Sequence, residues 1–162
     1  MRRYLVYMGY VLRHKWFVFL EACKLGIPWR GLVHDLDKLR PDEFIPYARF
    51  FHNPDGRKRQ VRNRTGYYKP DDTGDAAFDF AWFLHQKRNR HHWQSFVFPL
   101  SAGGERIMPM QRADVLEMIA DWRGAGRAQG TPDTIAWYCQ NGDKLRLHPD
   151  TRVLVESLLE RS

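Results

Sequence analysis

The sequence has little cysteine and lacks the motifs of several large enzyme classes. Its 162 residues include two cysteines, Cys23 and Cys139, which stand far apart and form no C-x-x-C pair. This usage predicts free thiols in a reducing cytoplasm. No P-loop, G-x-S-x-G elbow or paired Cys/His nucleophile is present, so the chemistries built on those motifs are excluded.

Long hydrophobic runs are also missing. Arg2 and Arg3 precede an apolar stretch that resembles a signal peptide, but basic residues 13–15 interrupt it and no small-residue cleavage site follows. No stretch reaches the roughly 18 uninterrupted apolar residues of a membrane span. We therefore expect a buried N-terminal helix, a cytoplasmic location and no membrane partner.

Aromatic residues and positive charge are plentiful. Aromatics make up 14% of the chain, the formal net charge is +7 and the mean hydropathy is −0.60. The length suits one domain with its own core, spanning residues 1–162. The positive charge favours anionic partners such as nucleotides or nucleic acid, and it does not choose among them.

Hydrophobic periodicity and helix-boundary residues predict a mostly α-helical single domain. Residues 95–108, with a Gly-Gly pair near the middle, predict a small β-hairpin. Cap and proline signals place helix starts at Pro41, Pro109 and the Thr131-Pro132-Asp133 string, and Gly124 is expected to end one helix. The expected helices are 3–25, 29–39, 41–51, 76–89, 109–124, one beginning at about 131, and 149–160.

Residues 53–75 break the periodicity and predict a long surface loop. The loop carries a basic run, 57–64, which is followed by Tyr67 and Tyr68. Cations next to aromatic rings are typical of single-strand nucleic-acid binding, whereas a charge run of this kind is also typical of a solvated face.

His14 lies in the first helix on a stripe of buried type. One apolar stripe consists of residues 5, 8, 12, 16, 19 and 23, and a second, nearly opposite, consists of residues 7, 11, 18 and 25 together with His14. A helix that is apolar on two sides is central to its domain. We expect an inward imidazole, which requires a polar partner or a metal ion.

Histidines and aspartates recur along the chain in the order H…HD…H…HH…D. His34-Asp35 and Lys38 form an H-D-x-x-K string, in which the ammonium could hold a phosphate oxygen or pair with Asp37 or Asp42.

Three further histidines are close in sequence. His85, Asn89 and His92 would share one face if the helix continued, and His91 and Arg88 lie among them. Such a cluster favours metal ligation or anion capture, and a basic surface helix end is the alternative.

Asp121 closes the series in an apolar turn, where a carboxylate needs a cation, either a metal ion or an arginine. Glu117, one turn earlier, could face solvent or accept a hydrogen bond from a ligand histidine.

Taken together, these motifs resemble the HD-domain superfamily of metal-dependent phosphohydrolases. The segments WRGLVHD, NRHHW and EMIADW are also similar to an uncharacterised bacterial and phage family with the pattern H…HDxxK…H…HHW…EMxxDW. The resemblance covers roughly residues 13–123. It implies an HD-type helical bundle, inside a bacterial or phage-infected cell, in which His14, His34, Asp35 and Asp121 bind a first ion.

The remaining roles also follow from the resemblance. His85 and His92 are expected at a second ion, with Arg88, Asn89 and His91 at the substrate phosphate and with Asp35 and Lys38 catalytic. The histidine-rich set favours Mn or Fe over Co, Ni and Zn, as one or two ions. His85 lies close to His91 in sequence, so this cluster could instead face phosphate. The basic run is not part of the superfamily pattern.

The function expected from this pattern is hydrolysis of a nucleotide or other small phosphate ester. Two alternatives stay open: an HD-type di-iron oxygenase with the same six ligands, and a nucleic-acid-binding or inhibitor module that uses the basic run. The sequence does not indicate the oligomeric state.

Overall fold

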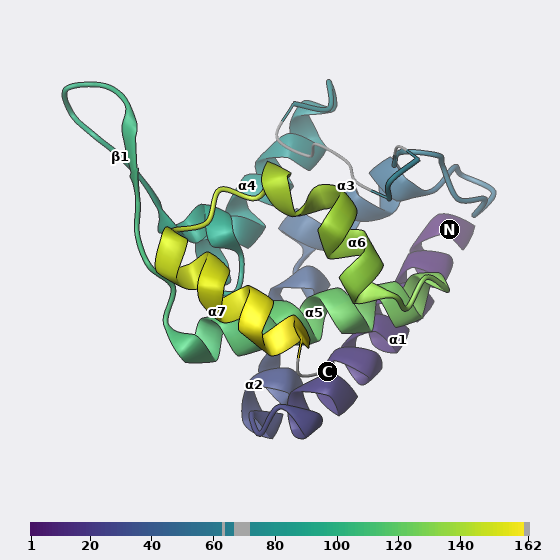
Figure 1. The fold of residues 1–162 in the computed structure, drawn as a ribbon. Helices are drawn as coiled ribbons and strands as arrows, with labels where there is room; N and C mark the ends of the chain where they lie inside the picture. Colours follow the sequence, from purple (N-terminus) through teal and green to yellow (C-terminus); the bar gives the residue numbers. More distant parts are fainter. Residues whose placement is uncertain (63, 67–71, 161–162) are drawn as a thin grey trace.

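The chain folds mostly into α-helices, with one two-stranded antiparallel hairpin, in a computed structural model that describes residues 1–62, 64–66 and 72–160 (Figure 1). Three short 3-10 helices, η1–η3, connect the longer elements. The elements are α1 (Arg2–Lys24), α2 (Pro28–Val33), η1 (Leu36–Leu39), α3 (Pro41–Phe51), α4 (Ala76–Arg88), η2 (Trp93–Phe96), β1 (Val97–Pro99), β2 (Glu105–Ile107), α5 (Arg112–Gln129), α6 (Thr134–Asn141), η3 (Gly142–Lys144) and α7 (Pro149–Glu160).

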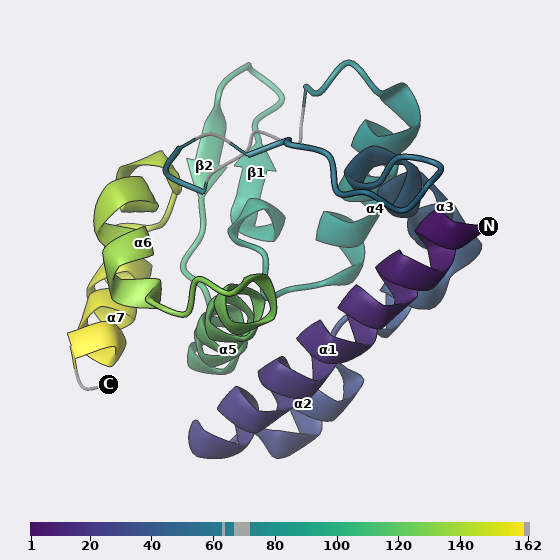
Figure 2. The ribbon, with the colours of Figure 1, turned by 90° about the vertical axis from the view of Figure 1, so that its right-hand side faces the viewer.

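Two apolar clusters make up most of the core. The first joins the N-terminal half of α1 to α3 and α4, and it includes the stacked rings of Phe50 and Phe78, whose centroids are 3.8 Å apart. The second joins α5, α6 and α7 around Met118 and Ile119. Helix α1 crosses beside α5, with α6 and α7 on the other side of α5 (Figure 2). The polar residues described below lie between the two clusters.

Helix α1 is buried along one stripe instead of two. Tyr7, Val11, His14 and Val18 are buried, as the sequence predicted for their stripe. The prediction for the opposite stripe was wrong, because Leu12 and Trp16 are more than half exposed. The long apolar side chains on this face have no covering element among the described residues, so periodicity alone could not distinguish them from core.

Helix α5 continues past Gly124, where the sequence predicted its end. A Cβ atom on Gly124 would lie 2.5 Å from Val18 Cγ2 and 2.7 Å from Val18 N, so a glycine here lets α5 pack directly on α1. The helix ends instead at Gly130, which adopts a left-handed conformation. The glycine signal was genuine, and it marks close packing where we had expected termination.

The helix expected over residues 29–39 breaks in the middle. Helix α2 ends at Val33, His34 is extended, and Asp35 adopts a left-handed conformation with φ 52° before η1 begins. Asp35 is the one non-glycine residue with positive φ among those described. Strained backbone of this kind is concentrated at functional sites. Adjacent residues on a helix point about 100° apart, so a continuous helix would direct His34 and Asp35 to different sides. The break lets the two side chains face the same site.

The start of α5 was predicted at Pro109, but the helix begins at Arg112, with Gln111 as its N-cap. The remaining boundaries agree closely with the predictions. Helices α3 and α7 have the predicted limits, α4 ends one residue early, and the strands of the hairpin pair where expected. The start of α6 differs, because Asp133, and not Thr131, caps that helix through Ala136 N. The described part of 53–75 contains an isolated bridge between His52 and Lys58 but no helix or strand, which confirms a long connection.

Residues 63 and 67–71, including Tyr67 and Tyr68, lie outside the described residues. Cys23 and Cys139 are exposed free thiols. No described helix combines the length and apolar character that crossing a membrane requires.

Candidate metal centre

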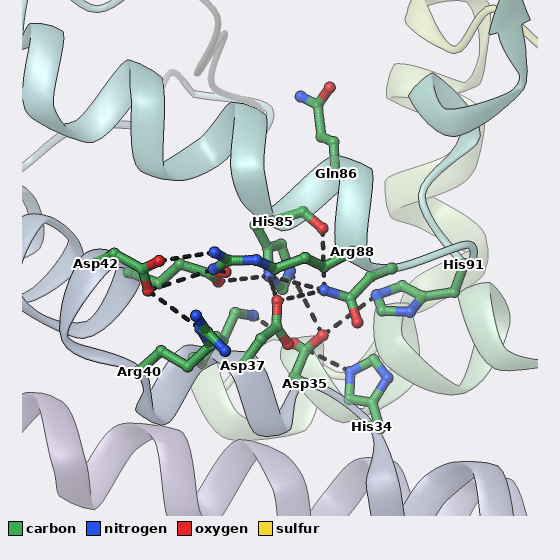
Figure 3. Close-up of polar contacts among 12 residues, drawn as sticks. His34, Asp35, Asp37, Arg40, Asp42, His85, Gln86, Arg88 and His91 are labelled. Carbon is green, nitrogen blue, oxygen red and sulfur yellow. Dashed lines mark hydrogen bonds and ion pairs between the residues drawn. The ribbon is translucent and has the colours of Figure 1, made fainter.

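Two groups of possible metal ligands meet at Asp35. The members of each group have one ligand atom apiece within 4.8 Å of one another. One group is His14, His34, Asp35 and Asp121, and the other is Asp35, His85, His91 and His92. We call these the first and the second ligand group. Figure 3 shows Asp35 between His34, His85 and His91, with dashed lines marking its contacts.

The two carboxylate oxygens of Asp35 face different groups. Oδ2 lies 3.6 Å from His14 Nε2 and 3.2 Å from His34 Nε2. Oδ1 lies 3.4 Å from both His85 Nε2 and His91 Nε2. In the first group, Asp121 Oδ1 is a further 3.2 Å from His14 Nε2. Asp35 therefore has the placement of a bridging carboxylate.

In both groups, at least one nitrogen of each histidine ring lacks a hydrogen-bond partner. The Nε2 atoms of all five histidines are buried without a partner, as is Asp35 Oδ1. Leaving a buried polar atom unpaired is costly, and clusters of such atoms are explained by an ion or water that satisfies them. The observed separations also fit, since two ligands about 2.1 Å from one ion lie about 3.0–3.4 Å apart.

Each ligand comes from a different part of the fold. His14 belongs to the buried stripe of α1, and Asp121 belongs to α5 where that helix packs on α1. The break between α2 and η1 presents His34 and Asp35 together. His85 lies in the last turn of α4, whereas His91 and His92 lie in the turn that follows it.

His85 is oriented by two carboxylates that the sequence analysis did not assign to the site. Its Nδ1 lies 2.9 Å from Asp37 Oδ2 and 3.0 Å from Glu43 Oε2. Glu43 is fully buried at the start of α3. Such carboxylates fix the tautomer of a ligand histidine and point its other nitrogen at the ion.

Arg88 and Asn89, which the sequence predicted at the substrate phosphate, face carboxylates beside His85 in this structure. Arg88 Nη2 is 2.7 Å from Asp42 Oδ2 (Figure 3), and its Nη1 contacts Glu43. Asn89 Nδ2 donates to Asp37 Oδ2 at 2.6 Å. Both side chains are already engaged in holding the acids that hold His85.

Glu117 is an acceptor for histidines of both groups. Its Oε1 lies 3.0 Å from His34 Nδ1 and 3.2 Å from His91 Nδ1. Its Oε2 accepts from Arg30 Nε at 2.7 Å. Of the two alternatives drawn from the sequence, the geometry therefore matches a histidine acceptor and not a solvent-facing acid.

Two lysines lie beside the first group. Lys38 Nζ is 2.5 Å from Asp35 Oδ2, so its partner is Asp35 and neither Asp37 nor Asp42. Lys15 Nζ donates to the backbone carbonyl of His34. Asp121 and Lys38 have side chains that are each 16% exposed, in contrast to the fully enclosed Asp35. The first ligand group is therefore partly accessible to solvent at Asp121 and Lys38.

The charges keep most ligands in a state suited to an ion. Burial alone would raise the pKa of Asp35, but the neighbouring histidines and Lys38 hold this pKa well below its ordinary value. Burial lowers the pKa of His91, and it lowers that of His92 further with the help of His91. For His34, burial acts downward, but the surrounding carboxylates outweigh it and raise the pKa well above 6.5.

The structure brings all six predicted ligands together, and it adds His91, which was expected at substrate, to the second group. Sequence reasoning missed Asp37, Glu43 and Arg30 as parts of the site. Acids near the start of a helix are ordinary, so Glu43 carried little signal. Arg30 could be found only by knowing which acid it faces.

Comparison with known proteins gives one match. No curated protein and no solved structure matches the chain. The sequence profile of DUF5662, described as a family of unknown function, matches residues 3–161. Since that match covers nearly the whole sequence, the chain belongs to the DUF5662 family.

Proposed function

We propose that this protein is a metal-dependent phosphohydrolase that acts on a nucleotide or another small phosphate ester. One observation carries the proposal: five buried imidazole nitrogens without hydrogen-bond partners belong to two ligand groups that share Asp35, and four of these nitrogens lie 3.2–3.6 Å from its two oxygens. An HD-type assignment of the bundle is part of the same proposal and is supported by the order of the ligands along the chain.

The donor set fits two divalent transition-metal ions. Imidazoles with a few carboxylates suit Mn, Fe, Co, Ni or Zn better than Mg, and we favour Mn or Fe. The first ligand group would hold one ion and the second group the other, with Asp35 shared between them. Such ions lower the pKa of a water molecule and polarise a phosphoryl oxygen.

The side chains around the ions have distinct roles in this proposal. Lys38 keeps Asp35 oriented and has further N–H groups with which to neutralise charge on a phosphate. The substrate would approach from the side of Lys38 and Asp121, whose side chains are each 16% exposed. Arg88 and Asn89 would act indirectly, by holding the acids that orient His85.

Hydrolysis of a panel of phosphate esters tests the proposal. Protein loaded with Mn²⁺ or Fe²⁺ is incubated with nucleoside mono-, di- and triphosphates, cyclic dinucleotides and p-nitrophenyl phosphate, and the products are separated by chromatography. We expect hydrolysis of at least one substrate, abolished by a chelator and by Asp35→Asn. Hydrolysis of none of them would contradict the proposal.

The alternatives give different results in the same samples. Oxygen consumption by the iron-loaded protein without hydrolysis of any ester would favour the di-iron oxygenase. Nucleic-acid binding that weakens steeply with salt and survives Asp35→Asn would favour the binding module.

A further inference from the structure

We propose that Glu117 couples the two ion sites by holding one histidine ligand of each through a single carboxylate oxygen. Glu117 Oε1 is 3.0 Å from His34 Nδ1, in the first ligand group, and 3.2 Å from His91 Nδ1, in the second. The two rings are adjacent, with centroids 4.4 Å apart. The inference rests on the ion sites of the proposed function but does not depend on hydrolysis.

A carboxylate oxygen in this place dictates the tautomer of both rings. An ionised carboxylate only accepts hydrogen bonds, so each imidazole must present its proton on Nδ1. In the neutral form of each ring, the lone pair of Nε2 is then free for an ion, and both of these nitrogens point at Asp35, at 3.2 Å for His34 and 3.4 Å for His91. Glu117 thus prepares one ligand for each ion.

The carboxylate of Glu117 is itself held in place. Arg30 Nε donates to the other oxygen, Oε2, at 2.7 Å. Arg30 Nη2 in turn lies 2.5 Å from Asp114 Oδ1, and Arg90 Nη2 lies 3.3 Å from Asp114 Oδ2. Asp114 and Glu117 are one turn apart on α5, which also carries Asp121. The position of Glu117 is therefore fixed independently of either histidine.

The other outer carboxylates have no such double role. Glu43 and Asp37 contact Nδ1 of His85, which belongs to the second ligand group alone. Glu43 is as deeply buried as the histidine it holds, and it is paired with an arginine in the same way as Glu117. Glu43 is therefore a matched control for the one-site effect.

Coupling follows from the shared oxygen. An ion bound to His34 Nε2 fixes that ring and its hydrogen bond to Glu117, which reduces the freedom left to His91. The second ion then orders fewer groups when it binds, and positive cooperativity results. Loss of the Glu117 carboxylate should weaken the binding of both ions.

The test is a Mn²⁺ titration of metal-free wild type, Glu117→Gln and Glu43→Gln by calorimetry, with spin-coupled pairs followed by electron paramagnetic resonance. Glutamine has the same size, but its NH₂ group must face either Arg30 or the histidines, and all of these are donors. We expect wild type to bind two ions. The affinity for both should fall about 10- to 100-fold in Glu117→Gln, whereas the affinity for only one should fall in Glu43→Gln.

Circular dichroism of the metal-free variants confirms that each is folded. Arg30→Met is a second, milder variant, which leaves Glu117 in place but frees its Oε2. This variant should weaken the binding of both ions by less than Glu117→Gln does. A Glu117→Gln protein that loses affinity for one ion only, or for neither, would overturn the inference without affecting the proposed function. A wild type that binds two coupled ions but hydrolyses no ester would refute the proposed function alone. Fewer than two ions in wild type would overturn the coupling.

Discussion

The sequence indicates two regions that could bind an anionic partner, the buried ligand groups and the basic loop, and the surroundings of the two differ. In the centre, the Nε2 atoms of the five ligand histidines and Asp35 Oδ1 are buried with no hydrogen-bond partner. In the loop, the side chain of Arg57 is 86% exposed, and Arg59 lies over the ring of Phe50 and donates to a backbone carbonyl. Unsatisfied burial, and not the sign of the charge, marks the stronger candidate for a site.

The largest effect should come from Asp35→Asn, which removes the carboxylate shared by both ligand groups. Asparagine tolerates the left-handed backbone of Asp35, so the local fold is preserved. We expect both ions to be lost, a larger effect than the roughly 100-fold of an outer-sphere change, as measured by metal content after desalting. Asp55→Asn, in the exposed loop, is the matched control and should keep both ions. A full metal content in Asp35→Asn would contradict the conclusion that the ligand groups are the stronger candidate site.

Two further variants divide the centre. Asp121→Asn should lose the ion of the first group and retain the other, since Asp121 contacts His14 and His34. His92→Gln should do the reverse, because His92 belongs to the second group. Metal stoichiometry by native mass spectrometry should give one ion for each of the two variants. If Asp121→Asn kept full metal, Asp121 would be only a structural acid.

Metal binding should weaken as the pH falls. Burial lowers the pKa of His34, but Asp35 and the other carboxylates outweigh this effect and raise the pKa well above 6.5. The metal-free ring therefore holds a proton at neutral pH that an ion must displace, and affinity falls up to about tenfold per pH unit for each displaced proton. Calorimetry in buffers of different ionisation enthalpy measures the protons released. An affinity equal at pH 6 and pH 8 would refute this account.

The smallest effect should come from Arg59→Ala in the basic loop. Arg59 is exposed and contacts no ligand of either group, so metal content should be unchanged and unfolding free energy should shift by less than about 0.5 kcal/mol. Chemical denaturation and metal analysis measure both quantities. Loss of metal in this variant would connect the loop to the centre.

The sequence predicted most helices because their signals are local. Proline and acidic residues at the first turn identified α3, and a proline likewise placed the start of α7. The break at His34-Asp35 was not predictable from such signals, because Asp35 is held in its left-handed conformation by partners distant in the chain, such as His85. Gly124 was misread for a related reason, since its neighbour is Val18 on another helix.

For the site, the ligand types were predictable and their supports were not. A polar residue inside an apolar helical stripe, such as His14 or Asp121, is visible in sequence as a group that needs a partner. Glu43 and Arg30 act through contacts 42 and 87 residues away, and no spacing rule connects such pairs. Arg88 looked available for phosphate because its acidic partners come from a separate helix.

Anomalous diffraction from crystals grown with Mn²⁺ tests the central claim most directly. The account predicts two peaks on opposite sides of Asp35, one among His14, His34 and Asp121 and the other among His85, His91 and His92. The half-buried His148 and the exposed Asp150, whose Nδ1 and Oδ2 are 3.6 Å apart, give an internal comparison and should show no peak. Absence of any peak at Asp35 in crystals that contain Mn²⁺ would contradict the account.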